Sequence, residues 1–358
     1  MIPATAIENA LANLPFELRA KVHSVLMKFS LICFSVFAIS AIPAFPQTTN
    51  AACTATHYKV IRLPIQPLRA NDAGVIVGTT EEKHLATWSE KDGLREIPIP
   101  QGFSAAEVTG INREGDVSGF ATKAGSEQTL AFQYSHGKFV LLSEDLSRAT
   151  AINDSGDTAG QDGQRLVLWS KGGKSTLGGC CGGSIRAMNN HGEIVGQLND
   201  KQGKYGAFSW SQQDGLRSIA PTDATSSSAV AVNDAGDVLV QSVAPSGAYL
   251  LRNGKPETVQ LAAEGVSQPL AMNACDVVVG EFGAASDFYH AFVWDRSHGF
   301  TDLNQRIAAG TQWTLESAVD INTRGEIIGI GDYGDEEDLG YLLVPEPSAA
   351  PRQATPRK

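Results

Sequence analysis

The sequence predicts a seven-bladed β-propeller, an all-β ring of four-stranded antiparallel sheets. Three observations predict this fold: a short word that recurs seven times, the absence of helical patterning after residue 26, and a last repeat that lacks one strand. The composition agrees, because the 358 residues include 36 glycines and 16 prolines, and only 19% are charged. That profile is typical of short strands separated by turns.

The recurring word is Asn-x-x-Gly-x-(Ile/Val)-x-Gly, and its spacing sets the size of the repeat. The asparagines of the seven copies are Asn71, Asn112, Asn153, Asn189, Asn233, Asn273 and Asn322. Successive copies lie 36 to 49 residues apart, which is room for about four short strands. Because one such sheet cannot bury both of its faces, the units must stack, and a ring of stacked sheets is a propeller.

Each copy of the word also predicts a tight turn. An asparagine side chain accepts hydrogen bonds from the backbone two residues on, and a residue with positive φ three positions later completes the hairpin. A residue with a Cβ costs about 1 to 2 kcal/mol in that conformation. Six copies have glycine there, and the remaining copy has Asp276, one of the better-tolerated substitutes.

The two ends of the repeat array predict how the ring closes. The last repeat ends with an apolar strand at residues 340–344 and has no fourth strand. Residues 58–63, before the first asparagine, have the alternating pattern of the missing strand. We therefore expect the N-terminal segment to complete the last blade.

The position two residues before each asparagine carries a further prediction about closure. It is small in five copies, as a crowded inner strand requires, but it is Arg69 in the first copy and Asp320 in the seventh. Only a closed ring makes these two copies neighbours, so we predict an ion pair between Arg69 and Asp320. The alternative is that each side chain meets solvent separately at the channel mouth.

The N-terminus predicts export. An apolar run of 14 residues, 29–42, follows basic residues and is shorter than the roughly 20 residues of a membrane span, so it fits a signal peptide better than an uncleaved anchor. We divide the chain into residues 1–26 (n-region or mis-assigned start), 27–52 (signal peptide and linker), 53–344 (propeller) and 345–358 (disordered Pro-rich tail). The mature protein is then secreted or periplasmic, without a membrane span.

Four cysteines lie beyond the signal: Cys53, Cys180, Cys181 and Cys275. An exported chain is free to form disulfides, and four cysteines allow three pairings that the sequence does not separate. Their spacing fits no zinc site, and unpaired thiols are the alternative.

Two segments resemble a known family. Residues 177–196, which contain Leu-Gly-Gly, a serine and then Met-Asn-Asn-His-Gly-Glu-Ile-Val-Gly, resemble the repeat of the HAF-repeat family, and His290-Ala291-Phe292 matches the triplet that names it. The resemblance covers about residues 58–344. It implies an extracellular repeat protein and no assigned chemistry.

The variable connections predict where a ligand binds. The connections that lead into the inner strands, and those between second and third strands, emerge on one face and differ from copy to copy, whereas the asparagine turns opposite are uniform. Phe282, Phe288, Tyr289 and Trp313 on that face are candidates for an aromatic platform for a sugar or peptide. Packing under the loops is the alternative for Phe282 and Trp313.

Two other features of that face are weaker candidates. In the run Gly-Gly-Cys180-Cys181-Gly-Gly, the two cysteines can form a disulfide with each other, which would make a rigid knob at the rim, or remain free thiols in a mobile loop. The acidic residues of 332–338 lack the ligand spacing of a calcium loop, so a solvated loop is favoured. We therefore predict no metal site and no cofactor.

These features predict a function only in outline. The net charge of −11 argues against a nucleic-acid partner, and no triad or paired carboxylate pattern indicates catalysis. We expect a monomeric, non-enzymatic module that binds an unknown protein or glycan. The alternative is a polysaccharide hydrolase or lyase with acidic residues, Asp320 among them, at the channel mouth.

Overall fold

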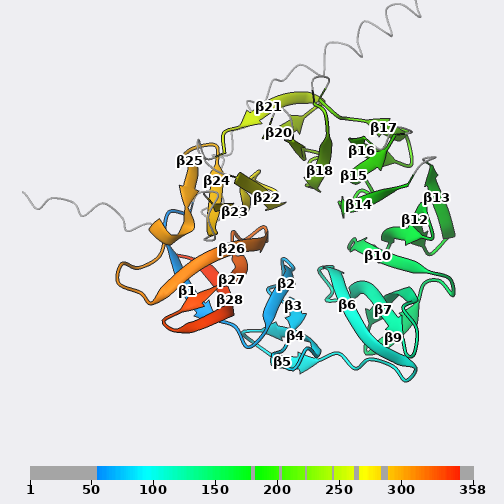
Figure 1. The fold of residues 1–358 in the computed structure, drawn as a ribbon, viewed down its shortest axis with the longest axis horizontal. Coiled ribbons are helices and arrows are strands. Elements are labelled where there is room, and N and C mark those ends of the chain that lie inside the picture. Colours follow the sequence, from blue (N-terminus) through cyan, green and yellow to red (C-terminus); the bar gives the residue numbers. More distant parts are fainter. Residues whose placement is uncertain are drawn as a thin grey trace, which may run out of the picture. The chain divides into compact units, whose positions relative to one another are not determined.

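The computed structural model is a seven-bladed β-propeller, as the sequence predicts (Figure 1). It describes residues 55–178, 182–200, 204–221, 224–243, 246–261, 266–283 and 289–346. The predicted n-region, signal peptide and all but the first two residues of the tail lie outside these residues. Within the described part of the chain, no helix is long and apolar enough to cross a membrane.

Each blade is a four-stranded antiparallel sheet whose strands follow one another outward from the channel. The first three blades consist of β2 (Gln66–Ala70), β3 (Ile76–Thr79), β4 (Leu85–Ser89) and β5 (Gly93–Glu96); β6 (Phe103–Ile111), β7 (Val117–Lys123), β8 (Thr129–Ser135) and β9 (Lys138–Leu141); and β10 (Ser147–Ile152), β11 (Thr158–Asp162), β12 (Arg165–Ser170) and β13 (Gly173–Gly178).

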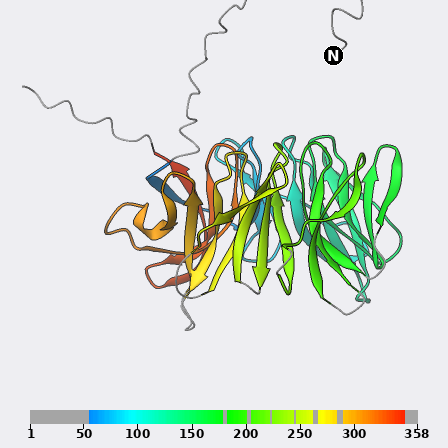
Figure 2. The same ribbon diagram turned by 90° about the horizontal axis from the view of Figure 1, so that it is seen from above.

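The next three blades repeat this order. They consist of β14 (Gly183–Met188), β15 (Ile194–Asn199), β16 (Tyr205–Ser211) and β17 (Gly215–Ser218); β18 (Ser227–Val232), β19 (Val238–Val243), β20 (Ser246–Arg252) and β21 (Lys255–Val259); and β22 (Val266–Met272), β23 (Val278–Gly283), β24 (His290–Asp295) and β25 (Gly299–Asp302). Figure 2 shows the strands of the ring from the side.

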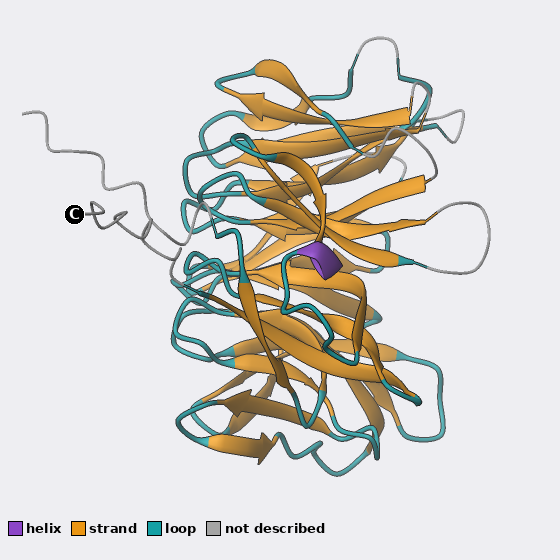
Figure 3. Ribbon diagram, turned by 90° about the vertical axis from the view of Figure 1, so that its left-hand side faces the viewer, coloured by secondary structure: helices purple, strands orange, loops and turns teal. Residues whose placement is uncertain are grey.

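The seventh blade combines the two ends of the described chain. It consists of β26 (Trp313–Ile321), β27 (Ile327–Tyr333), β28 (Glu336–Pro345) and, as its outermost strand, β1 (Tyr58–Arg62). β1 and β28 are antiparallel, with Tyr58 opposite Pro345 and Arg62 opposite Tyr341. The prediction that the N-terminal segment completes the last blade is therefore confirmed. Figure 3 shows one short helix, η2 (Leu303–Gln305), among the strands.

The asparagine turns have the predicted backbone. The six glycines of the turns have φ between 74° and 86°, and Asp276 takes the same region with φ of 60°. In each turn the N–H of this residue donates to the asparagine carbonyl, at 3.0 to 3.1 Å. Positive φ is thus required at this position, and glycine meets the requirement without strain.

The apolar core lies between blades rather than within them. One cluster joins Leu166 of the third blade to Ile194 and Phe208 of the fourth. Another joins Ile76 of the first blade to Ile328 of the seventh. Each blade therefore needs its neighbours to remove apolar surface from water, which is why the repeats form a ring.

All seven inner strands contain a β-bulge at the same place, three residues before the asparagine. The residue at the register shift is skipped by the pairing with the second strand, and the seven skipped residues are Leu68, Thr109, Thr150, Arg186, Val230, Leu270 and Val319. A bulge re-aims the side chain of the extra residue. The bulge was not predicted from the sequence, and it decides which side chains line the channel.

Candidate functional site

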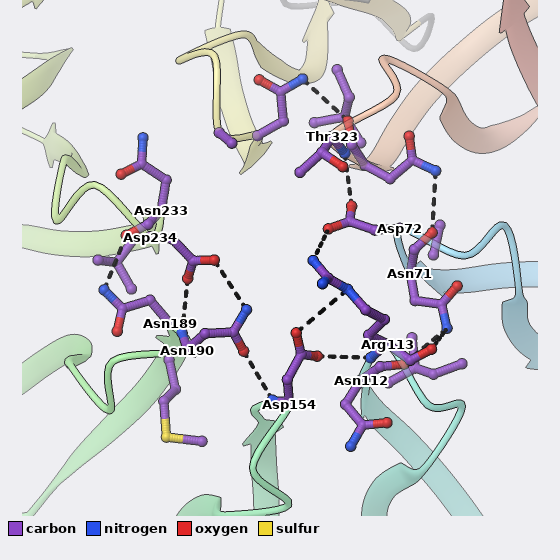
Figure 4. Close-up of a pocket in the computed structure, with 18 of the residues that line it drawn as sticks. Asn71, Asp72, Asn112, Arg113, Asp154, Asn189, Asn190, Asn233, Asp234 and Thr323 are labelled. Carbon is purple, nitrogen blue, oxygen red and sulfur yellow. Dashed lines mark hydrogen bonds and ion pairs between the residues drawn. The ribbon is translucent and has the colours of Figure 1, made fainter.

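The channel has two mouths that differ in chemistry. We call one the turn mouth, lined by six of the seven repeat asparagines, all but Asn153, and by the residue that follows each of the seven, and it encloses about 200 Å³ (Figure 4). The other is the loop mouth, on the side of the variable connections, with a cavity of about 550 Å³. Which one is available to a ligand depends on whether its polar groups already have partners.

At the turn mouth, each asparagine oxygen holds its own turn. Asn71 Oδ1 accepts hydrogen bonds from the backbone N–H groups of Ala73 at 3.1 Å and Val75 at 2.8 Å. Because Asn71 is buried, water cannot readily replace its oxygen as the acceptor for these two N–H groups. The predicted role of the asparagines in their turns is confirmed by this geometry.

The asparagine nitrogens have a second role that sequence reasoning missed. Asn71 Nδ2 donates to the Asn112 carbonyl of the next blade at 2.8 Å, and Asn322 Nδ2 donates to the Asn71 carbonyl at 3.2 Å across the seam between the seventh and first blades. Asn233 Nδ2 instead reaches Asp276 Oδ1 at 2.9 Å. The available signal was the uniform choice of asparagine, because an ionised aspartate could hold the turn but has no donor for the next blade.

The residues that follow the asparagines form a second set of inter-blade bonds. Asp154 Oδ1 accepts from the backbone N–H of Arg113 at 2.8 Å, and Asp72 Oδ1 accepts from Thr323 N–H at 2.8 Å across the seam. The Arg113 guanidinium lies 3.7 Å from both carboxylates (Figure 4). The polar groups of the turn mouth therefore bind one another, and this mouth is a structural closure.

Contrary to the prediction, Arg69 and Asp320 form no direct ion pair, and each has a different partner. The two side chains make no ion pair within 4.0 Å; Asp320 Oδ2 instead accepts from the backbone N–H of Ala70 at 2.9 Å, and Arg69 Nη1 donates to the Leu68 carbonyl at 2.7 Å. Asp320 still links the seventh blade to the first, as the closed ring requires. Burial raises the pKa of its carboxyl above the usual value, while the charge of Arg69 and two backbone hydrogen bonds oppose this change.

The loop mouth is lined by residues from several inner strands and from the variable connections. Its lining comprises Leu68, Arg69, Arg186, Gln197, Tyr205, Ser226, Ser227, Ser228, Val230, Gln241, Val243, Gln268, Pro269, Leu270 and Val319. Five of these residues are the bulge residues of their strands. The shared bulge thus turns one position of the repeat toward the cavity and makes most of its aliphatic wall.

The described part of the loop mouth carries positive charge. Its only charged lining residues in the described chain are Arg69 and Arg186, from blades on opposite sides of the channel in Figure 1. Both residues are exposed. Arg186 makes no hydrogen bond or ion pair with any described residue, and the one hydrogen bond found for Arg69 goes to the carbonyl of Leu68. Guanidinium groups so exposed retain most of their donors for a ligand.

Four neutral polar side chains of the loop mouth also lack hydrogen-bond partners in the described chain, whereas Ser226 and Ser227 have them. The amides of Gln197, Gln241 and Gln268 line the cavity, and no hydrogen bond joins them to other described residues. The buried hydroxyl of Ser228 likewise has no partner in the described chain. This mouth therefore combines donors, acceptors and aliphatic surface that the fold itself leaves unused, which is typical of a ligand site.

The predicted aromatic platform is not brought together among the described residues. Phe282 packs against Phe300 at 5.0 Å and His290 at 5.7 Å between ring centroids, all in the sixth blade. Trp313 packs against Tyr333 at 5.4 Å in the seventh. The packing alternative is correct for both residues. Tyr289 is exposed and carries no such contact, and Phe288 lies outside the described residues.

The cysteine predictions are resolved only in part. Cys275 is disulfide-bonded, so the alternative of four unpaired thiols is wrong. Its partner lies outside the described residues, as do Cys53, Cys180 and Cys181. The choice between a knob and a mobile loop at Cys180 and Cys181 therefore stays a prediction.

The acidic residues that the sequence singled out lie apart from the loop mouth in the described chain. No carboxylate lines the loop mouth in the described chain, and Asp320 is bonded to the backbone at the seam. In the acidic 332–338 segment, Glu336 pairs with Arg62 at 2.7 Å, which lowers the pKa of Glu336. The described residues contain no group of three ligands that could hold a metal ion.

Comparison with known proteins identifies the fold. No family model matches the sequence, and no curated protein matches it. The β-propeller domain of the Trilobed protease from Pyrococcus furiosus is similar in structure, with a TM-score of 0.55 and 8% identity over 80% of this chain and 97% of that one.

Two other structures are similar over a comparable part of the chain. Pyrococcus horikoshii acylaminoacyl peptidase matches with a TM-score of 0.51 and 12% identity over 81% of this chain, which spans only 52% of that peptidase. TolB from Acinetobacter baumannii matches with a TM-score of 0.47 and 9% identity over 80% of this chain and 96% of that one. The two matches with TM-scores above 0.5 support a β-propeller fold, and their identities of 8% and 12% do not identify a ligand or activity.

Proposed function

We propose that this protein is a secreted or periplasmic, non-enzymatic binding module of the HAF-repeat type that takes its ligand at the loop mouth. The observation that carries the proposal is the contrast between the two mouths. At the turn mouth the polar groups bond across the blades, whereas at the loop mouth arginines, glutamines and a serine surround an aliphatic wall without side-chain partners in the described chain. Unpartnered polar groups around a concave apolar surface favour a ligand.

Four further observations support the proposal. The loop mouth lies on the face where the connections vary, which is the usual place for recognition. The apolar run at 29–42 favours export, and the segment at 177–196 favours the HAF-repeat family. The rival function is hydrolysis or elimination on a polysaccharide. It needs a catalytic carboxylate, and the described lining of the loop mouth contains none.

The proposal is tested by blocking the cavity. Val230→Trp adds bulk at a half-buried bulge position that lines the loop mouth, and Val140→Trp makes the same change on an exposed residue, 51% accessible, of the outer strand β9. We expect Val230→Trp to abolish capture of ligands from a glycan array and from secreted-protein fractions, and Val140→Trp to retain it. Both variants are first compared with the wild type by thermal unfolding.

Two results would overturn the proposal. One is ligand capture that survives in a folded Val230→Trp variant, because the ligand would then bind elsewhere. The other is turnover of a polysaccharide by the wild type that Asp320→Asn abolishes, because the protein would then be an enzyme that uses the seam carboxylate.

A further inference from the structure

The positive charge of the described lining of the loop mouth favours some ligands over others. The chain as a whole carries a net charge of −11, yet the cavity is lined by two guanidinium groups and by no carboxylate of the described chain. A guanidinium matches the geometry of a carboxylate with two parallel hydrogen bonds. Because Arg186 has no partner among the described residues, its charge is available at the cavity wall, and an anionic group is the complementary ligand.

The glutamines restrict the rest of the ligand. A carboxamide offers both an acceptor and donors, as a peptide bond does, so Gln197, Gln241 and Gln268 can each pair with the N–H or C=O of an extended backbone. A hydrocarbon chain with a single carboxylate would leave these amides without partners in a desolvated site, which is costly. The polar part of the ligand is therefore larger than one anion.

The aliphatic wall restricts it further. Leu68, Val230 and Leu270 present branched apolar side chains to the cavity, and Val243 stands at its rim, 68% exposed. An acidic oligosaccharide would place hydroxyl groups against this wall, whereas an aliphatic side chain would bury apolar surface against it. The volume of about 550 Å³ is within the range of small-ligand sites, roughly 300 to 1,000 Å³.

Resting on the proposed function, we infer that the loop mouth binds the carboxylate end of an extended polypeptide whose last residues are aliphatic. The terminal carboxylate meets Arg186 and Arg69 from opposite sides of the channel. The last peptide bonds pair with the glutamine amides, and the aliphatic side chains pack against the bulge residues. The ligand class is thus a peptide C-terminus, recognised by its carboxylate and by aliphatic last residues and not by one exact sequence.

The inference is tested with paired probes on the full exported chain. A pentapeptide library with Ala, Val, Leu or Ile at its last two positions is prepared both as free acids and as C-terminal amides, and affinities are measured by calorimetry. We expect the free acids to bind at least tenfold more tightly than the amides. Arg186→Gln should reduce this preference to less than threefold, because it removes a charge and keeps the polarity.

The matched control is Arg165→Gln. Arg165 is also an exposed arginine, at the start of β12, but it does not line the loop mouth. The control should leave the preference for free acids unchanged. Thermal unfolding of both variants shows whether each has kept its fold.

The failures of the two proposals are distinguishable. Equal affinity for acids and amides, absence of peptide binding, or tight binding of an oligogalacturonate or a fatty acid in place of peptides would overturn the peptide inference. In each case a ligand that Val230→Trp excludes would leave the loop mouth as the binding site. A peptide that binds equally well to folded Val230→Trp would overturn both.

Discussion

The dual role of the asparagines leads to a prediction that can be worked from one residue, Asn71. Its oxygen accepts two backbone hydrogen bonds in its own turn, and its nitrogen donates to the Asn112 carbonyl of the next blade. Asn71 is only 5% exposed. Asn71→Ala removes these three bonds, each with a net value of about 1 kcal/mol, and a longer one from Nδ2 to the Arg113 carbonyl at 3.4 Å, and it leaves buried groups without partners. We expect it to lower the free energy of unfolding by about 3 to 4 kcal/mol.

Asn71→Asp separates the two roles. The aspartate keeps the shape of the side chain and both accepted bonds, but its second oxygen faces the Asn112 carbonyl, so an acceptor meets an acceptor. When protonated, the carboxyl can donate to that carbonyl, so the fold raises its pKa. Because the pKa of this carboxyl is higher in the folded state than in the unfolded state, its contribution to stability is present at low pH. That contribution is lost as the pH rises through the folded-state pKa. The loss is about 1.4 kcal/mol for a folded-state pKa that lies one pH unit above the unfolded-state pKa.

Urea unfolding at pH 4 and pH 7 measures both variants. We expect Asn71→Asp to cost about 2 to 3 kcal/mol at pH 7 and less than about 1 kcal/mol at pH 4, and the cost of Asn71→Ala to be nearly the same at both. The control is Asn253→Asp at an exposed turn, which should stay within about 0.5 kcal/mol at both pH values. Equal costs for the Ala and Asp variants at both pH values would refute the inter-blade role.

Three other predictions follow from the turns and the seam. Asp276→Gly should destabilise the protein by about 1 to 2 kcal/mol in urea unfolding, although it relieves a positive φ, because Asp276 accepts from Asn233 and pairs with Arg252; a gain in stability would contradict this. Asp320→Asn should gain on the wild type as pH rises from 3 to 7 in the same assay, since the raised pKa makes the wild type lose stability on ionisation; a constant difference would contradict it. Deletion of β1 should produce aggregates in size-exclusion chromatography, because it exposes the edge of β28; a monodisperse monomer would count against the seam.

The fold was predictable because its determinants are local and repeated. The turn needs an asparagine and a positive-φ residue three positions apart, and both can be read from a single copy of the word. The missing strand could be assigned because Tyr58 to Leu63 alternate as the other strands do. The copy with Asp276 was also predictable, since aspartate tolerates the conformation that the backbone adopts there.

The site was less predictable because its determinants lie in pairings between strands. The bulge before each asparagine shifts one residue of every inner strand out of the regular alternation. Without that shift, nothing in the sequence distinguishes Arg186 or Val230 from residues that face the neighbouring blade. The pairing of Arg69 with Asp320 failed for a related reason. The position two residues before the asparagine was correctly placed at the seam, but the carboxylate of Asp320 accepts a hydrogen bond from the backbone N–H of Ala70 instead.

The separation of the two mouths has a consequence for how such a ring can acquire binding specificity. At the turn mouth a side chain such as Asn322 bonds its own turn and the next blade at once, so its replacement weakens the ring. Arg186, in contrast, is exposed and its side chain bonds to no described residue, so we expect its replacement to change the stability of the fold by about 0.5 kcal/mol or less. Substitutions at such a residue can change ligand binding without changing the stability of the fold. The loop mouth is therefore the part of the ring where binding properties can differ between propellers of the same stability.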